Sequence, residues 1–251
     1  MAGPCDACRN GDAFTIPFSM AFQPVIDLEA RRIVSYEALV RGPEGQGALW
    51  VLSQVTAENR YAFDQACRVR ALELAASAGL DRRLNINFLP NAVYEPKACI
   101  RLTLETAARV GIPLDRITFE IVEDERIGDL KHLAGIVGEY RRQGFKVALD
   151  DFGAGFSGPN VLHGLHPDLV KLDMAMVRDI DIDRRRRIIA QGMIQVCHAL
   201  DIEVVAEGVE RAEEAAVLRD CGVRLFQGYL FAKPAFERLV GDDAITYPVP
   251  S

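Results

Sequence analysis

Two adjacent aspartates, Asp150 and Asp151, follow the apolar run Val147–Leu149 and precede Phe152 and a glycine. Neighbouring carboxylates repel each other and resist burial, so something must stabilise them there. A solvated turn would explain an isolated pair, and bound cations would explain a pair that belongs to a larger site. The choice depends on the polar residues that the rest of the chain brings to the same place.

Other apolar runs also end in a polar side chain. The residues at these ends are Glu37, Asn87, Glu120, Asp150, Lys171, Glu207 and Gln227, with Glu123, Asp151, Asp173 and Glu210 one to three positions further on. Each has an ordinary explanation when taken singly; Lys171, for example, could pair with Asp168. The repetition along the chain favours a single shared site.

The charge of this set predicts bound cations. Its five central carboxylates are Glu37, Glu120, Asp150, Asp151 and Glu207. Lys171 contributes one positive charge, which leaves four negative charges. Two divalent cations would balance these four. Without cations, several carboxylates would have to bind protons. Oxygen ligands together with one amide, Asn87, suit hard ions such as Mg²⁺ or Mn²⁺ rather than zinc.

Two metals bridged by a carboxylate, about 3.5–4 Å apart, hydrolyse phosphate esters by activating a water and holding the oxygens of an in-line displacement. Arg41 follows Glu37 and Leu39 at two-residue spacing, so it shares their strand face and could hold a phosphate oxygen. Lys171 could orient or deprotonate the attacking water. These residues predict a two-metal phosphoesterase and leave its substrate open.

Eight short runs could position the site. They are Phe18–Val25, Ile33–Val40, Leu84–Leu89, Ile117–Val122, Lys146–Asp150, Leu169–Asp173, Glu203–Glu207 and Arg224–Gly228. Most are continuously apolar, as strands buried on both faces are. Helical periodicity separates most of them, in residues 48–78, 97–110, 127–143, 183–200 and 212–220. The alternation predicts an α/β fold, a TIM-like (β/α)8 barrel whose strand ends share one mouth.

The first connection departs from this pattern. Six residues, DLEARR, separate Ile26 from Ile33, whereas a parallel crossover needs about a dozen. We therefore expect a hairpin, with the first strand antiparallel to the rest. We also expect one domain over residues 15–240, with a flexible N-terminal tail (1–14) and a C-terminal tail (241–251).

Bulk composition excludes several classes of protein. Of 251 residues, 49% are hydrophobic and 26% charged, and the net charge of -7 argues against binding to a nucleic-acid polymer. No apolar run approaches the roughly 18 residues of a membrane span, and no signal peptide is visible, so we expect a cytoplasmic protein without a membrane partner. Six cysteines do not suggest a disulfide framework in this chain. Cys5 and Cys8 form a lone CxxC without the second pair that structural zinc needs.

Seven segments resemble, in order and spacing, the motif series of EAL domains, which are cyclic di-GMP-specific phosphodiesterases. They are YEALVR, NINFLP, FEIVE, LDDFGAG, DLVKLD, VVAEGVE and FQGYLF, within about residues 18–236. The resemblance implies a barrel with an antiparallel first strand. It also implies hydrolysis of cyclic di-GMP to the linear dinucleotide pGpG, dependent on two Mg²⁺ or Mn²⁺ ions and inhibited by Ca²⁺.

The resemblance also implies residue roles. The metal ligands by motif position are Glu37, Asn87, Glu120, Asp150, Asp151 and Glu207, and Lys171 resembles the residue that holds or activates the water. The positions that contact the dinucleotide are Gln23, Leu39, Arg41 and Gln227. Glu123 resembles the glutamate that braces the loop after the aspartates, Glu210 lies outside the ligand shell, and Asp173 supports the site beside Lys171.

Departures from the family pattern leave the ligand set complete. Leu89 stands where a serine is common, Gly42 replaces a common tryptophan, and the loop 153–160 differs at several positions. In the family that loop couples the metals to a dimer interface, so the resemblance implies a homodimer and an upstream sensory domain or partner. Two alternatives remain: a catalytically silent cyclic di-GMP receptor or protein-interaction module, and a two-metal hydrolase of another phosphodiester. The complete ligand set favours the cyclic di-GMP enzyme.

Overall fold

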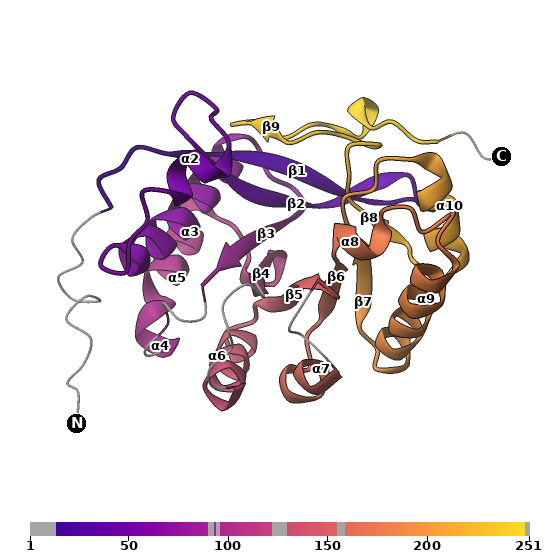
Figure 1. The fold of residues 1–251 in the computed structure, drawn as a ribbon. Coiled ribbons are helices and arrows are strands. Elements are labelled where there is room, and N and C mark those ends of the chain that lie inside the picture. Colours follow the sequence, from indigo (N-terminus) through magenta and orange to yellow (C-terminus); the bar gives the residue numbers. More distant parts are fainter. Residues whose placement is uncertain (1–13, 90–92, 94–95, 122–129, 155–158, 249–251) are drawn as a thin grey trace.

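The computed structural model describes residues 14–89, 93, 96–121, 130–154 and 159–248 (Figure 1). Its strands, in chain order, are β1 (Ser19–Asp27), β2 (Arg32–Arg41), β3 (Arg83–Phe88), β4 (Ile117–Ile121), β5 (Lys146–Phe152), β6 (Leu169–Leu172), β7 (Glu203–Ala206), β8 (Leu225–Phe226) and β9 (Ala235–Phe236). Neighbouring strands from β2 to β8 pair in parallel. β1 runs antiparallel to both β2 and β8 and so closes the sheet into a barrel. The predicted barrel with an antiparallel first strand is confirmed.

Asp27 holds the tight turn that makes β1 antiparallel to β2. Its Oδ1 accepts the backbone N–H groups of Glu29 and Ala30 at 3.1 and 2.9 Å, and its Oδ2 lies 2.8 Å from the Arg224 guanidinium. An aspartate that binds its own turn in this way favours reversal of the chain. Arg31 completes the reversal with a φ of 51°.

Helices surround the barrel (Figure 1). They are α2 (Ala48–Leu52), α3 (Arg60–Ser77), α4 (Pro96–Cys99), α5 (Arg101–Val110), α6 (Leu130–Arg142), α7 (Pro159–Leu165), α8 (Met174–Val177), α9 (Arg184–Ala199) and α10 (Ala212–Asp220), with 3-10 turns η2 (Leu114–Arg116) and η3 (Asp242–Ala244). The predicted helix over residues 48–78 is wrong in its continuity. Asn59 breaks it by accepting the Thr56 N–H and donating to the Gln54 carbonyl. The sequence analysis also missed α7.

A small apolar layer inside the barrel supports the polar residues above it. Its members are Val25, Ala148, Leu169, Val205 and Leu225. Each lies two positions along its strand from a polar residue of the proposed site, so the pleat places both on the same face. The larger apolar core lies between the strands and the helices. None of the helices in the described part of the chain is long and apolar enough to cross a membrane.

Candidate active site

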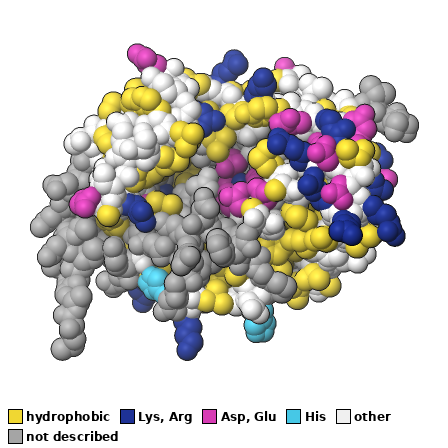
Figure 2. All heavy atoms as spheres, viewed as in Figure 1, with side chains coloured by type: hydrophobic (Ala, Val, Ile, Leu, Met, Phe, Trp, Pro, Cys, Tyr) yellow, Lys and Arg dark blue, Asp and Glu magenta, His cyan; other side chains and the backbone are white. Residues whose placement is uncertain are grey.

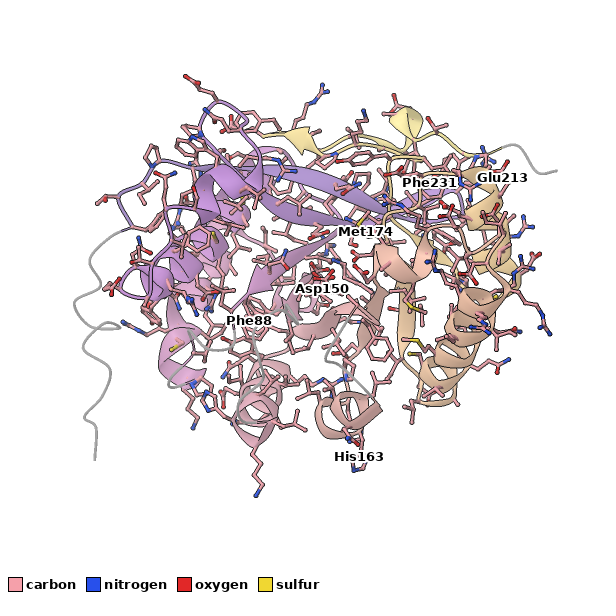
Figure 3. All side chains as sticks on the ribbon, in the orientation of Figure 1. Phe88, Asp150, His163, Met174, Glu213 and Phe231 are labelled. Carbon is pink, nitrogen blue, oxygen red and sulfur yellow. The ribbon has the colours of Figure 1, made fainter. Side chains whose placement is uncertain are left out.

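The carboxyl ends of the strands surround an acidic hollow. A cleft of about 320 Å³ opens there, lined by Gln23, Glu37, Asp150, Asp151, Lys171, Asp173, Met174, Glu207, Gly208, Glu210, Gln227, Gly228 and Tyr229. Figure 2 shows acidic side chains gathered in this hollow at the middle of the face in view, and Figure 3 labels Asp150 within the barrel and Met174 on α8. Most of the predicted strand-end residues therefore line one cleft.

Lys171 lies among four carboxylates. Its Nζ is 2.7 Å from Glu207 Oε1, 3.0 Å from Glu120 Oε2, 3.1 Å from Asp150 Oδ1 and 3.3 Å from Glu37 Oε2. Only 1% of Lys171 is exposed. A single buried ammonium therefore holds together carboxylates that come from four different strand ends.

Amide side chains hold two of these carboxylates in place. Gln227 Nε2 and Asn87 Nδ2 donate to the two oxygens of Glu37 at 2.6 and 3.1 Å. Asn85 Nδ2 donates to Glu120 Oε1 at 2.9 Å. The sequence analysis missed Asn85, although its two-residue spacing from Asn87 on the same strand was a usable signal.

Asp151 reaches the cleft because the backbone turns there. Its φ is 54°, in the left-handed region, and the pairing of β5 with β6 shifts register between Leu149 and Phe152. The Asp151 N–H donates to Asp150 Oδ1 at 3.0 Å. Gly153 follows with a φ of 100°, and a Cβ there would lie 2.8 Å from Met176 Cγ. The bulge therefore lets consecutive aspartates face one cleft.

The arrangement fits two hard cations. Two groups of three carboxylates each place one oxygen per residue within 4.8 Å of the others: Glu37 with Glu120 and Asp150, and Asp150 with Asp151 and Glu207. Asp150 belongs to both groups, as a bridging carboxylate does in a two-metal site. Glu120 Oε2 is buried and accepts no hydrogen bond of normal geometry from the described residues, although Lys171 lies beside it. Such an oxygen is suited to a cation.

Burial and mutual repulsion raise the pKa values of part of the cluster. Burial raises the pKa of Glu120 and Glu207 well above the usual range, and Lys171 offsets only part of that effect. Burial also acts to raise the pKa of Glu37, but Lys171, Gln227 and Asn87 together hold it below its usual value. Burial, with repulsion from Asp150 and Asp173, raises the pKa of Asp151 to about 7.

Burial would lower the pKa of Lys171, but Asp150 and the other carboxylates around it raise it well above its usual value. The ammonium therefore stays charged. Raised carboxylate pKa values around one fixed positive charge indicate an excess of negative charge, which divalent cations would neutralise.

The remaining predicted residues surround the cluster. Gln23 lies beside Gln227, whose Nε2 is 3.3 Å from Gln23 Oε1, and the half-buried Leu39 is on β2 opposite Ala21. Arg41 donates to the Val40 carbonyl at 2.7 Å. Asp173 caps α8 by accepting the Ala175 N–H at 2.7 Å.

Glu210 is further out than the predicted ligands. Its carboxylate lies 3.8 Å from Arg178, and its backbone N–H donates to Glu214 Oε2 at 3.3 Å. Glu123 lies outside the described residues.

Comparison with known proteins identifies the family. The sequence profile of the EAL domain matches residues 13–234. The chain belongs to the EAL domain family.

This EAL domain is similar to parts of longer proteins. The blue light- and temperature-regulated antirepressor BluF of Escherichia coli is 33% identical over 236 residues, covering 93% of this chain and 58% of BluF. The cyclic di-GMP phosphodiesterase NbdA of Pseudomonas aeruginosa is 30% identical over 226 residues, covering 85% of this chain and 28% of NbdA. The EAL domain thus spans little more than half, or less, of these relatives.

Solved structures share the barrel and carry the nucleotide. A standalone versatile EAL protein from Vibrio cholerae, in its c-di-GMP-bound form, is 47% identical with a TM-score of 0.88, covering 91% of this chain and 97% of that one. Klebsiella pneumoniae BlrP1, in a complex with calcium and cyclic di-GMP, is 35% identical with a TM-score of 0.85, covering 90% of this chain and 57% of BlrP1. A further BlrP1 complex holds manganese with the same nucleotide.

Proposed function

We propose that this EAL domain hydrolyses cyclic di-GMP to linear pGpG with two Mg²⁺ or Mn²⁺ ions. The observation that carries the proposal is the position of Asp150 in both carboxylate groups. Family membership supports it, as do the names of relatives that include a cyclic di-GMP phosphodiesterase. When bound, two such ions would supply an activated water and charge neutralisation at the phosphate.

The protein's residues would divide the work as follows. The proposed ligands are Glu37, Asn87, Glu120, Asp150, Asp151 and Glu207. Asn87 donates its amide N–H to Glu37, which leaves its carbonyl oxygen for a cation. Lys171 would hold and orient the attacking water as an ammonium, because its Nζ lies between both carboxylate groups.

Substrate contacts are proposed for the cleft wall. Gln23 and Gln227 adjoin Glu37 and present amides to the dinucleotide, with the half-buried Leu39 and Arg41 further along β2. Arg41 would have to exchange its contact with the Val40 carbonyl for a phosphate. Asp173 and Glu210 would support the adjoining loops from α8 and the segment after β7. Glu123 is proposed to brace the loop after the aspartates.

We also propose a homodimer that regulates the metals through loop 153–160, of which residues 155–158 lie outside the described part of the chain. The face of α9 supports this interface, because Ile188, Ile189 and Val196 are 47–56% exposed. Ile194 of the same helix is fully buried and belongs to the core instead. A dimer contact transmitted to Asp151 would change how the second metal is held, and we expect Glu123→Gln to lower both metal affinity and activity.

We also propose a reducing, cytoplasmic setting and regulation by an upstream sensory segment or partner. Cys67, Cys197 and Cys221 form no disulfide among the described residues, as expected in a reducing compartment. We propose residues 15–240 as the bounds of the domain. Residues beyond 240 nonetheless pack on the barrel, since Ile245 is buried and Asp242 accepts the Ile33 N–H.

A second candidate function is a cyclic di-GMP receptor that acts by binding alone. The relative named as an antirepressor favours it, and the unbroken set of carboxylates argues against it. Both functions predict nucleotide binding, and only the enzyme predicts a product.

The test is incubation of the protein with cyclic di-GMP and Mn²⁺, followed by chromatography for pGpG. We expect complete conversion by the wild type. Glu37→Ala and Asp150→Asn should nearly abolish hydrolysis, because each removes carboxylate oxygen from the proposed metal groups. Asp115→Asn is the control, since Asp115 is exposed in η2 just before β4, at the other end of the barrel.

Calcium separates binding from chemistry. Ca²⁺ should fill the same oxygen-rich site with looser coordination, so the nucleotide should bind and persist. Binding without product in Mn²⁺ would favour the receptor, and rapid cleavage in Ca²⁺ alone would contradict the proposed mechanism.

A further inference from the structure

A buried ion pair lies on the outside of the barrel wall that carries two of the proposed ligands. Asp64 and Arg68, one turn apart on α3, form a salt bridge, and they are 2% and 0% exposed. Arg68 also donates to the Tyr140 hydroxyl of α6 at 3.4 Å. The sequence analysis assigned no role to either residue.

The pair is poorly explained by stability. Removing two charges from water is costly, and apolar side chains of similar volume often stabilise a core as well or better. Arg68 Nε is buried and has no hydrogen-bond partner among the described residues. The pair keeps a carboxylate in the core, and that carboxylate has a specific second partner.

The second partner is the backbone just after the proposed ligand Asn87. Asp64 Oδ1 accepts the Leu89 N–H at 3.0 Å. Leu89 lies two residues beyond Asn87, where β3 has ended and its ladder no longer holds the chain. A charged acceptor makes a stronger hydrogen bond than a neutral one. Asp64 thus fixes the chain at the point where Asn87 must hold its amide against Glu37.

Aromatic side chains pack between the ion pair and the proposed metal site and connect the two. Phe88 and Phe119 point outward next to the inward-facing Asn87 and Glu120, and their ring centroids are 5.8 Å apart. Tyr140 packs on Phe119 at 4.9 Å, and the Arg68 guanidinium lies over the Phe119 ring at 5.8 Å. Displacement of the ion pair would move the same strand segments that carry the two ligands (Phe88 is labelled in Figure 3).

We infer that Asp64, held by Arg68, is a positioning residue that sets the Asn87 amide of the metal site through the Leu89 N–H. The inference rests on the proposed function of that site. Asp64 acts through the backbone and contacts neither cation nor substrate. Its measurable consequence is weaker binding of divalent cations when the hydrogen bond to Leu89 is lost from a folded protein.

Two double variants isolate that hydrogen bond. Asp64→Leu/Arg68→Met replaces the pair by apolar side chains and removes the acceptor. Asp64→Asn/Arg68→Met also removes both charges but leaves a side-chain oxygen for the Leu89 N–H. Gln65→Leu is the control, because Gln65 is buried in the same helix and donates to the Cys99 carbonyl instead.

Mn²⁺ affinity is measured by calorimetry, alongside kcat and KM for cyclic di-GMP and the thermal midpoint. We expect the leucine variant to bind Mn²⁺ about tenfold more weakly, in the range seen when the support of a metal ligand is lost, with kcat reduced and KM little changed. The asparagine variant should recover most of the affinity. Gln65→Leu should lower only the thermal midpoint.

Leu89→Pro provides an independent variant, because it removes the donor and leaves the ion pair intact. Leu89→Pro should weaken Mn²⁺ binding about tenfold, as expected for Asp64→Leu/Arg68→Met. It also tests the inference if the Asp64→Leu/Arg68→Met protein does not fold. Equal Mn²⁺ affinity in the leucine, asparagine and wild-type proteins would overturn the inference, as would an equal loss in Gln65→Leu. If Mn²⁺ affinity responds as expected while the wild type yields no pGpG, the positioning role stands and the proposed hydrolysis fails.

Discussion

Lys171 Nζ lies 3.1 Å from Asp150 Oδ1, so the buried ammonium contacts the carboxylate that both groups of proposed ligands share. A cation bound to Asp150 would therefore share that carboxylate with the Lys171 ammonium. The contact ties the proposed water-holding residue to the centre of the proposed metal site.

Lys171→Met should separate chemistry from metal binding. Loss of a positioned acid–base group lowers rates by about 10²–10⁴-fold, and we expect a loss of that size in kcat. Mn²⁺ affinity should be undiminished, because a positive charge has been removed from among the carboxylates. Lys146→Met, at the opposite end of β5, is the control and should leave kcat unchanged. A variant that loses metal affinity in proportion to kcat would contradict the assignment.

Metal affinity should fall as the pH is lowered from 8 to 6. Burial, Asp150 and Asp173 raise the pKa of Asp151 to about 7, so below that pH an incoming cation must displace a proton. Affinity should decrease by up to about tenfold per pH unit for each proton displaced. Calorimetry in two buffers of different ionisation enthalpy measures the proton release directly. Asp151→Asn should bind more weakly at pH 8 and show a flatter pH dependence, and a pH-independent wild type would rule the explanation out.

Asp27→Asn should destabilise the barrel at pH 7 by about 1.5–3 kcal/mol, the usual size for hydrogen bonds to a charged group. Burial acts to raise the pKa of Asp27, but the Ala30 N–H, Arg224 and the Glu29 N–H hold it below its usual range. A carboxylate with a lowered folded pKa contributes stability above its unfolded pKa and loses it as the pH falls through the folded one. The difference from wild type, measured by urea unfolding, should therefore narrow below about pH 4. Asp220→Asn, on an exposed side chain, should show no such difference.

Sedimentation should show a dimer at micromolar concentration, and Ile189→Glu should make it monomeric. Ile189 is 56% exposed in the apolar face of α9, and a charge placed within an apolar interface opposes association. Leu49→Glu is a demanding control, because Leu49 on α2 is 81% exposed and equally apolar. Monomer formation by both variants, or by neither, would argue against an interface on α9.

Local patterns in the sequence were enough to predict which residues lie at the strand ends. Continuous apolar runs locate buried strands, and a polar residue at the end of each run identifies what lies at the barrel mouth. The length of the connection after Ile26 alone predicts the antiparallel hairpin, because six residues cannot cross over. Glu37, Asn87, Glu120, Asp150 and Glu207 could all be selected in this way, since strand position and side-chain alternation are properties of neighbouring residues.

Closure of the barrel decided the contacts among them. The four carboxylates around Lys171 come from separate strands. Asn85 reaches Glu120 only because β3 and β4 adopt one register. The bond from Asp64 to the Leu89 N–H joins residues 25 positions apart through the packing of α3. Periodicity specifies which face a side chain takes, but distances across the barrel depend on register and helix packing, which involve the whole chain at once.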